Sequence, residues 1–228
     1  MIHNRKVIAL VPIKDHSERV VKKNFREFSG KPLYHHILET LQRTYAIDEI
    51  VINTDSVTVR DEAPKIFGKV KVLMRPKELT GDFVSVNKLI AYDLANSEGD
   101  IYIQTHATNP LLKAETIAKA LKKFVENEDE GKADSLFSVN RFQSRFYDKD
   151  RKPVNHNPDE LLRTQDLPPL YEENSCIYIF SKKSFSVKGT RIGEKPDLYE
   201  TPKVESVDID DEFTFKLAEI LALYSKES

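Results

Sequence analysis

Short apolar, β-branched runs alternate along most of this chain with segments of helical periodicity. Such alternation is typical of βαβ units, in which helices join parallel strands and cover both faces of the sheet. The first run, residues 6–13 (KVIALVPI), is almost continuously apolar, as expected for a strand that is buried on both faces. The pattern therefore predicts an α/β fold, with a Rossmann-like, mostly parallel sheet flanked by helices.

The predicted elements follow one another until the rhythm breaks near residue 141. After the first strand, further strands are predicted at 49–54, 70–74, 100–105, 135–139, 175–181 and 204–209. Helices are predicted at 33–43, 56–67, 85–95, 114–125 and 212–224, with Ser56 as N-cap of the second. Residues 141–171 are rich in Arg, Asp, Asn and Pro, which indicates an extended arm or insert. Because 228 residues can bury one substantial core, we expect a single domain over residues 1–228.

The amino-acid composition limits the classes of molecule that the protein is expected to bind. A formal net charge of −2 gives no overall attraction to nucleic acid or to an acidic membrane. Cys176 is the only cysteine, which excludes an intrachain disulfide and favours a reducing compartment. The apolar run near the N-terminus, about seven residues, is too short for a membrane span and lacks the cleavage site of a secretory signal. We therefore expect a cytoplasmic protein with small-molecule partners.

The loop after the first predicted strand carries the most informative chemistry. Residues 14–24 (KDHSERVVKKN) supply cations and orienting polar groups from Lys14, Ser17, Arg19, Lys22, Lys23 and Asn24. Ligands of open parallel sheets bind beyond the carboxyl ends of the strands, and a triphosphate needs both charge neutralisation and orienting donors. The glycine motifs GxxxxGK[ST] and GxGxxG are absent. The loop fits a nucleotide triphosphate, and taken alone it fits a solvated basic surface loop as well.

A second candidate lies near the other end of the chain, at Asp208, Asp210 and Asp211. If residues 204–209 form a strand, Asp208 and Asp210 project to the same side. Two neighbouring carboxylates repel each other unless a cation lies between them, and Mg²⁺ binds one or two carboxylates together with substrate phosphates. The alternative is that Asp210 or Asp211 caps the helix that begins near residue 212. The two interpretations are compatible, because Asp211 can cap while Asp208 and Asp210 hold the metal.

Three other segments offer polar groups at predicted strand ends or on extended chain. Arg75, followed by the turn at Gly81 and Asp82, suits a phosphate or a base, although a lone surface Arg is usually no more than a surface residue. Residues 104–110 (QTHATNP) offer neutral hydrogen-bonding groups that suit sugar hydroxyls, although a structural turn explains them equally. The arm holds Arg141, Arg145, Arg151 and Arg163, whose guanidinium groups favour carboxylates, although solvation explains Arg151 better.

Together these segments resemble the acylneuraminate cytidylyltransferase family, the CMP-sialic acid synthetases. The resemblance runs in order along nearly the whole chain. The matching segments are the loop ending in Lys23-Asn24, Asn53-Thr54-Asp55-Ser56, Met74-Arg75-Pro76 with Glu78-Leu79, residues 104–111, Arg163 to Pro168, Asn174 with Ile177-Tyr178-Ile179, and Asp208-Ile209-Asp210.

The resemblance implies transfer of CMP from CTP to the anomeric hydroxyl of a sugar acid, with release of pyrophosphate. It implies catalytic roles for Lys23 and Asp210, and Mg²⁺ bound by Asp208 and Asp210. The nucleotide would be held by Lys14, Ser17, Asn24, Arg75 and Asp82. The sugar would be met by Gln104 or His106, Arg163 and Tyr178. The resemblance also implies a homodimer in which the arm at 141–171 reaches the site of the partner.

Departures from the family pattern leave the acceptor open. Lys14 stands where the family has Arg, Ser17-Glu18-Arg19 replaces a glycine-containing stretch, and Asn174-Ser175-Cys176 replaces Asn-Gly-Ala. The segment at 104–110 is longer, so that His106 occupies the glutamine position when counted from Pro110. The acceptor is expected to be a nonulosonic, sialic-acid-like sugar, with 3-deoxy-manno-octulosonate or another acidic substrate as the alternative. A homologue that binds nucleotide without catalysis is a further alternative.

Overall fold

A seven-stranded sheet in the order β5-β4-β1-β6-β8-β7-β9 forms the centre of the protein. In the computed structural model, which describes residues 2 and 4–227, the first four of these strands run parallel. β8 is antiparallel to both of its neighbours, and β9 is parallel to β7. The bounds are β1 Val7–Ile13, β4 Glu49–Thr54, β5 Val70–Met74, β6 Ile101–Gln104, β7 Ser135–Phe142, β8 Leu170–Ser181 and β9 Pro196–Glu200. The predicted mostly parallel α/β sheet is confirmed.

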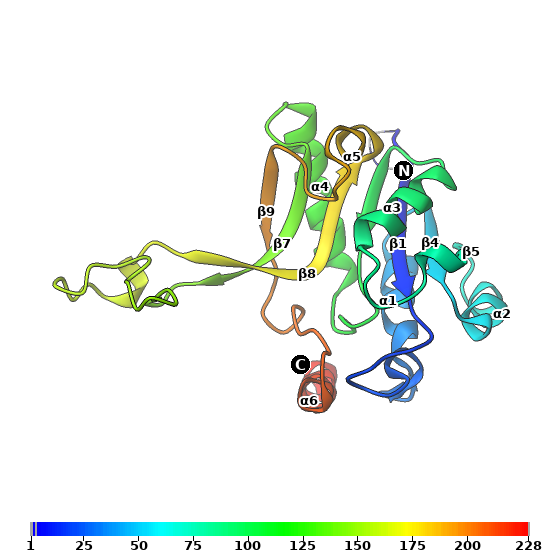
Figure 1. The fold of residues 1–228 in the computed structure, drawn as a ribbon, viewed down its shortest axis with the longest axis horizontal. Coiled ribbons are helices and arrows are strands. Elements are labelled where there is room, and N and C mark those ends of the chain that lie inside the picture. The colour runs from blue at the N-terminus through cyan, green and yellow to red at the C-terminus, as the bar shows by residue number, and fades with distance from the viewer. Residues whose placement is uncertain (1, 3, 228) are drawn as a thin grey trace.

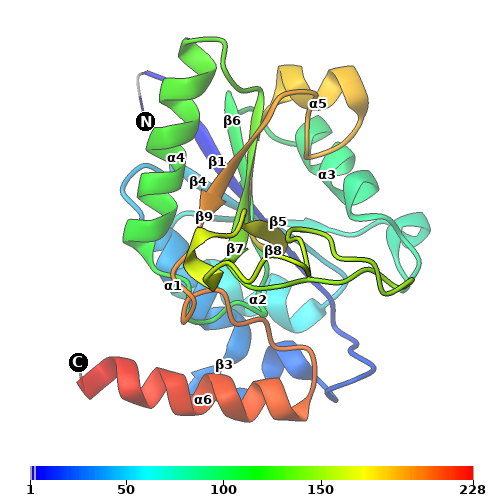
Figure 2. The ribbon, with the colours of Figure 1, turned by 90° about the vertical axis from the view of Figure 1, so that its left-hand side faces the viewer.

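Helices cover both faces of this sheet (Figures 1 and 2). The helices on the faces are α1 Leu33–Arg43, α2 Val57–Ile66, α3 Val86–Ala95, α4 Ala114–Asp129 and α5 Lys182–Lys188, whereas α6 Glu212–Glu227 lies below the sheet in both views. Alternate residues of β1 point to opposite sides, so that Val7 and Ala9 join the core under α1 and α4, while Ile8 and Leu10 join the core under α3 and α5. Both faces of β1 are therefore buried, as its continuous apolar run predicts.

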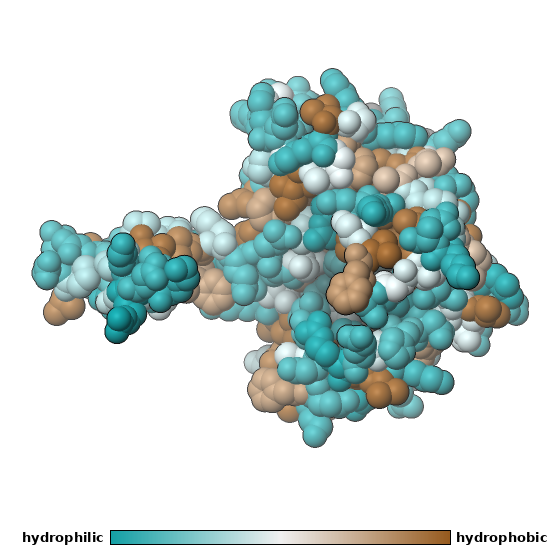
Figure 3. All heavy atoms as spheres, viewed as in Figure 1, coloured by the Kyte–Doolittle hydropathy of each residue, from teal (hydrophilic) through white to brown (hydrophobic). Residues whose placement is uncertain are grey.

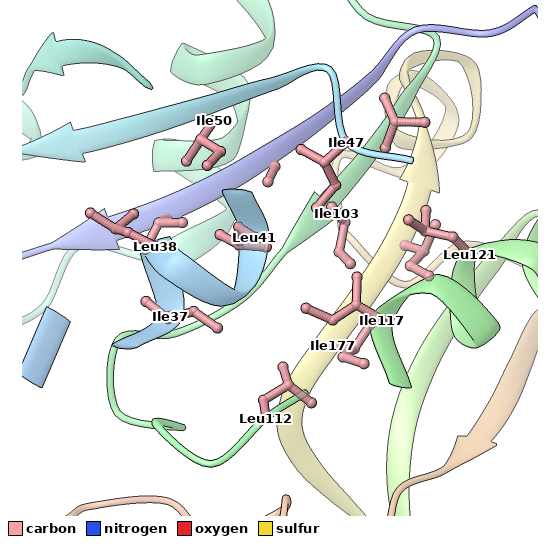
Figure 4. Packing of buried hydrophobic residues seen from close by; sticks show 14 of the residues in the cluster. Ile37, Leu38, Leu41, Ile47, Ile50, Ile103, Leu112, Ile117, Leu121 and Ile177 are labelled. Carbon is pink, nitrogen blue, oxygen red and sulfur yellow. The ribbon is translucent and has the colours of Figure 1, made fainter. Parts of the chain in front are cut away.

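The core under α1 and α4 is aliphatic and closely packed. Leu38 and Leu41 of α1 and Ile117 of α4 point toward Ile103 and Ile177 of the sheet (Figure 4). All five side chains are buried. This packing gives the strand ends a rigid base, from which the loops of the site begin.

The stretch between β7 and β8 projects from the body as an arm (Figures 1 and 3). The strands continue beyond the sheet as a two-stranded ribbon, in which Phe142 pairs with Leu170. The tip is tied locally, because Asn155 donates to the carbonyl oxygens of Ser144 and Pro168 at 2.7 and 2.9 Å. Residues 141–171 therefore form an arm, as predicted.

The prediction of a strand at 204–209 is wrong. The last position in the sheet is taken by β9, and residues 204–209 run outside the named strands. The alternating apolar residues have another cause, because Val207 and Ile209 pack with Val20, Phe28 and Phe215 in a third core beneath α6. The periodicity correctly predicted that these two side chains pack into a core. It could not determine whether they pack against a sheet or against a helix.

Two local features also differ from the sequence-based expectation. Ser56 stands at the N-cap position of α2, yet its hydroxyl donates to Asp15 Oδ1 at 2.7 Å and does not cap the helix. Helix α5, strand β9 and the small hairpin of β2 (Glu27–Phe28) and β3 (Lys31–Pro32) were not predicted. No helix within the described residues is long and apolar enough to cross a membrane.

Candidate active site

A pocket of about 360 Å³ lies at the carboxyl ends of the parallel strands. Its walls are the loop after β1, Arg75 and Asp82 after β5, the start of α3, and His106 after β6. A larger cavity of about 810 Å³ lies between α1, residues 110–115 and α6, and none of the predicted site residues lines it. The smaller pocket is therefore the candidate active site, because it gathers the chemistry at the edge where open parallel sheets bind ligands.

The loop after β1 is held in shape by its own polar side chains. Ser17 Oγ accepts from the main-chain nitrogen of Lys23 at 3.1 Å, and Asn24 Nδ2 donates to the carbonyl of Lys14 at 2.8 Å. Between them, Lys22 adopts a left-handed conformation with φ 51°, directly before the short 3₁₀ turn Lys23–Phe25. Ser17 and Asn24, predicted as nucleotide ligands, thus build the loop that presents the cations.

Lys23 reaches from this loop to the segment before α6. Its ammonium donates to the carbonyl oxygen of Ile209 at 2.6 Å and lies 3.9 Å from Asp210 Oδ1. The side chain is only 15% exposed. Burial lowers the pKa of Lys23, although the carboxylates of Asp208 and Asp210 oppose that shift. The structure therefore brings together the cation and the carboxylate pair that the sequence suggested separately.

The two carboxylates differ in their surroundings. Asp210 is half-exposed and accepts from Arg19 Nη2 at 2.8 Å. Asp208 has a buried Oδ1 without a hydrogen-bond partner among the described residues. Burial and the neighbouring charge of Asp210 raise the pKa of Asp208, against the influence of Thr108 and Lys23.

This arrangement fits Mg²⁺ that arrives with a nucleotide. The orphaned oxygen of Asp208 supplies a free hard ligand, and Asp210 supplies a second carboxylate beside it. Across residues 2 and 4–227 no group of three or more His, Cys, Asp or Glu side chains forms a metal cage. Mg²⁺ in proteins is usually bound by one or two carboxylates, and substrate phosphates complete its coordination.

Asp211 caps the last helix. Its Oδ1 accepts from the main-chain nitrogen of Thr214 at 2.8 Å, and its main-chain oxygen accepts from Phe215 N at 2.9 Å. Asp211 therefore forms the cap, whereas Asp208 and Asp210 form the carboxylate pair. The two interpretations of this motif are thus compatible, as expected from the sequence.

Arg75 is buried at the base of the pocket in a polar chain. Its Nε and Nη2 donate to the side-chain and main-chain oxygens of Asn53, at 2.8 and 3.0 Å. Asn53 in turn donates to Asp93 Oδ1 at 2.6 Å. Burial raises the pKa of Asp93 to about 7, although the bond from Asn53 and the charge of Arg75 oppose the rise. The guanidinium is thus fixed in direction before any ligand arrives.

Lys14 and Asp82 form an ion pair that joins two walls of the pocket. Lys14 Nζ donates to Asp82 Oδ1 at 3.0 Å, and both side chains are partly exposed. The same contact lowers the pKa of Asp82. The structure brings both predicted nucleotide ligands to the pocket, where each neutralises the other.

The predicted sugar ligands fall into three positions. His106 lines the pocket, whereas Gln104 lies behind it and is fully buried. Tyr178 is also buried, with its hydroxyl bonded to Glu173 and its ring covered by the guanidinium of Arg191 at 3.4 Å. Arg163 belongs to the arm segment, is exposed and pairs with Asp166 at 2.7 Å, and it does not line the pocket of its own chain.

Arg191 belongs to this neighbourhood and was missed by sequence reasoning. It lies between α5 and β9, in a segment without strand or helix periodicity. Its Nη1 donates to Gln104 Oε1, and its Nη2 lies 3.6 Å from Glu173 Oε1. No motif of the chain signalled it, because its contacts depend on the pairing of β8 with β6 and on the path of the chain after α5.

Comparison with known proteins decides the family. The cytidylyltransferase family profile matches residues 8–225 of the chain. The chain belongs to the cytidylyltransferase family. This cytidylyltransferase is therefore a nucleotidyltransferase. It is 26% identical to the pseudaminic acid cytidylyltransferase of Campylobacter jejuni, over 98% of this chain and 99% of the relative.

Two further similarities place the enzyme among its relatives. It is 26% identical to the N-acylneuraminate cytidylyltransferase of Streptococcus agalactiae, over 90% of this chain and 50% of that longer protein. The fold is similar to that of a CMP:2-keto-3-deoxy-manno-octonic acid synthetase complexed with CTP. That match has a TM-score of 0.66 at 16% identity and covers 98% of this chain and 100% of the other.

Proposed function

We propose that this cytidylyltransferase transfers CMP from CTP to the anomeric hydroxyl of a nonulosonic, sialic-acid-like sugar acid and releases pyrophosphate. The observation that carries the proposal is the contact between Lys23, which lines the pocket, and the Ile209–Asp210 segment. It brings the Lys23 ammonium close to Asp210, and there a cation would neutralise charge on a bound triphosphate. The relatives named for pseudaminic and N-acylneuraminic acid support the class of acceptor.

The reaction is an in-line displacement at the α-phosphorus of CTP. The sugar hydroxyl oxygen forms a bond to that phosphorus, its proton passes to water, and the bond to the bridging oxygen of pyrophosphate breaks. Such a step depends chiefly on positioning and on neutralisation of the developing charge. Lys23, held by Ile209, would neutralise the charge that collects on the leaving pyrophosphate.

Asp208 and Asp210 would hold Mg²⁺ in the nucleotide complex. When bound, the metal supplies charge stabilisation at the phosphates and lowers the pKa of the attacking hydroxyl. Arg19 pairs with Asp210 in the present structure and would have to share that carboxylate once the nucleotide binds.

The remaining pocket residues divide between the two substrates. Lys14 and Arg75, with the loop that Ser17 and Asn24 shape, would hold the cytidine nucleotide, and Asp82 would release Lys14 to a phosphate. His106, which is bonded to Gln104 and lines the pocket, would contact the sugar.

The arm extends the proposal to a homodimer. Arg163 is exposed on the arm and does not line the pocket of its own chain, and a guanidinium there is suited to the carboxylate of a sugar acid. The arm of one subunit would bring Arg163 to the site of the other subunit.

A product assay tests the function. The enzyme is incubated with CTP, Mg²⁺ and either a nonulosonate panel or 3-deoxy-manno-octulosonate, and products are identified by mass spectrometry. CMP-nonulosonate together with pyrophosphate is the expected result, and the Asp210→Ala variant serves as the inactive control. A CMP-octulosonate product alone would reassign the acceptor. No pyrophosphate with any sugar acid would refute synthetase activity.

A further inference from the structure

Arg191 is a largely buried cation for which the proposed reaction has no direct use. Its side chain is 18% exposed. It is fixed on several sides, by the ring of Tyr178 at 3.4 Å, by Glu173 Oε1 at 3.6 Å and by Gln104 Oε1. A guanidinium can only donate hydrogen bonds, so that its contact with Gln104 defines which end of that amide is oxygen.

The orientation of Gln104 determines the bonding of His106. With Oε1 accepting from Arg191, the amide nitrogen donates to the carbonyl of Thr105 at 2.9 Å and points at His106 Nε2, also at 2.9 Å. An amide nitrogen has no lone pair to offer a donor. His106 Nε2 must therefore be the acceptor, and the neutral ring carries its proton on Nδ1.

His106 Nδ1 remains available to a ligand. Nδ1 has no hydrogen-bond partner among the described residues. It also does not belong to the buried side-chain atoms without a partner, so Nδ1 is not a buried atom. The residue lines the pocket. Burial, with the nearby charges of Arg191 and Lys23, lowers the pKa of His106 to about 4, so that the ring stays neutral at physiological pH.

We propose that Arg191 is a positioning residue that acts through Gln104 to hold His106 as the Nδ1–H tautomer, so that the pocket presents a hydrogen-bond donor to an oxygen of the acceptor sugar acid. The identity of the ligand rests on the proposed function, whereas the hydrogen-bond chain is a property of the free protein. We call the hydrogen-bond chain Arg191–Gln104–His106 the relay. It gives the acceptor site a donor whose direction is set by Arg191, which lies 87 positions from Gln104 in the sequence.

Nitrogen-15 NMR of the histidine rings tests the relay without any substrate. The signals of His106 are assigned by their loss in His106→Gln. Wild-type protein is expected to show Nδ1 protonated and Nε2 unprotonated. Protonation at Nε2 in the wild type would overturn the proposal outright.

Variants of the relay separate positioning from a structural role. Arg191→Met is expected to mix the two tautomers of His106, and Arg191→Lys, which can still donate to Gln104, is expected to restore the wild-type form. Gln104→Glu replaces the donor beside His106 with a carboxylate oxygen, and should move the proton to Nε2. Lys183→Met on α5 removes the same charge outside the relay and should change nothing. An unchanged His106 spectrum in both Arg191→Met and Gln104→Glu would contradict the inference.

Kinetics connects the relay to the substrate. Loss of one oriented hydrogen bond should raise the KM for the sugar acid by about five- to tenfold in Arg191→Met, with the Kd for CTP unchanged. An unchanged KM would refute the role toward the acceptor. If no sugar acid is turned over by the wild type, the proposed function fails while the ring spectra still decide the relay.

Discussion

Lys23 and Ile209 are joined by a 2.6 Å hydrogen bond although 186 positions separate them in the sequence. Ile209 is itself held, because its main-chain nitrogen donates to the carbonyl of Thr108 at 2.9 Å and its side chain is buried beneath α6. The contact therefore fixes the loop after β1 to the segment that bears Asp208 and Asp210. The geometry of the proposed reaction depends on this junction.

Lys23→Met should lower turnover by about 100-fold or more, because removal of one well-placed charge donor to a developing anion costs about that much. The methionine keeps the apolar stem, so the fold should persist. Pyrophosphate release measures the effect. Lys22→Met, which changes an exposed cation next to it, should retain activity. Equal activity of the two variants would disprove the role of Lys23.

Asp210→Ala and Asp211→Ala should have opposite consequences. The first removes a proposed Mg²⁺ ligand and should abolish turnover while leaving the fold intact. The second removes the cap of α6 and should lower Tm while retaining turnover. Activity assays and thermal unfolding of both variants provide the comparison. Wild-type turnover in Asp210→Ala would refute the metal role.

Asp93 should give the stability of the protein a measurable pH dependence. Its pKa in the folded state is raised to about 7, so the folded protein binds that proton more tightly than the unfolded chain does. Stability is therefore lost as pH rises from the ordinary carboxyl pKa toward 7. Asp93→Asn removes this titration and can still accept from Asn53.

At pH 8 the Asp93→Asn variant should have a free energy of unfolding higher than wild type by on the order of 1–3 kcal/mol. The difference should shrink on acidification toward pH 4. Urea unfolding at a series of pH values measures it, with Asp159→Asn on the arm as the matched control. A wild-type pH profile in Asp93→Asn would mean that Asp93 is ionised in the folded protein at neutral pH.

Mixed dimers should reveal whether the arm serves the site of the partner. Asp210→Ala and Arg163→Met are each expected to lower activity as pure proteins. If Arg163 acts in trans, a mixed dimer holds one site that carries neither change, and co-refolding should restore activity. Size-exclusion chromatography with light scattering reports the oligomeric state. A monomeric wild type, or no recovery on mixing, would exclude the shared site.

Local sequence patterns predicted two kinds of element: strands buried on both faces, which are continuously apolar, and helices buried on one face, which have a single apolar side. The run at β1 and the helical spacing of α1 are examples, because burial imposes their periodicity directly. Residues 204–209 show where this reasoning stops. Ile209 alternates with polar residues as a strand would, but the surface it packs against belongs to α6.

The α/β architecture, the arm and the cations of the loop after β1 could be predicted from the sequence, since each depends on the composition or periodicity of one continuous segment. Three relationships became visible only in the folded chain: Lys23 meets Ile209 and Asp210, His106 lines the pocket with Gln104 behind it, and Arg191 fixes that amide. These contacts join segments far apart in the chain. Hydrogen bonds of a few ångströms between such segments depend on sheet order and helix packing, which no local pattern records.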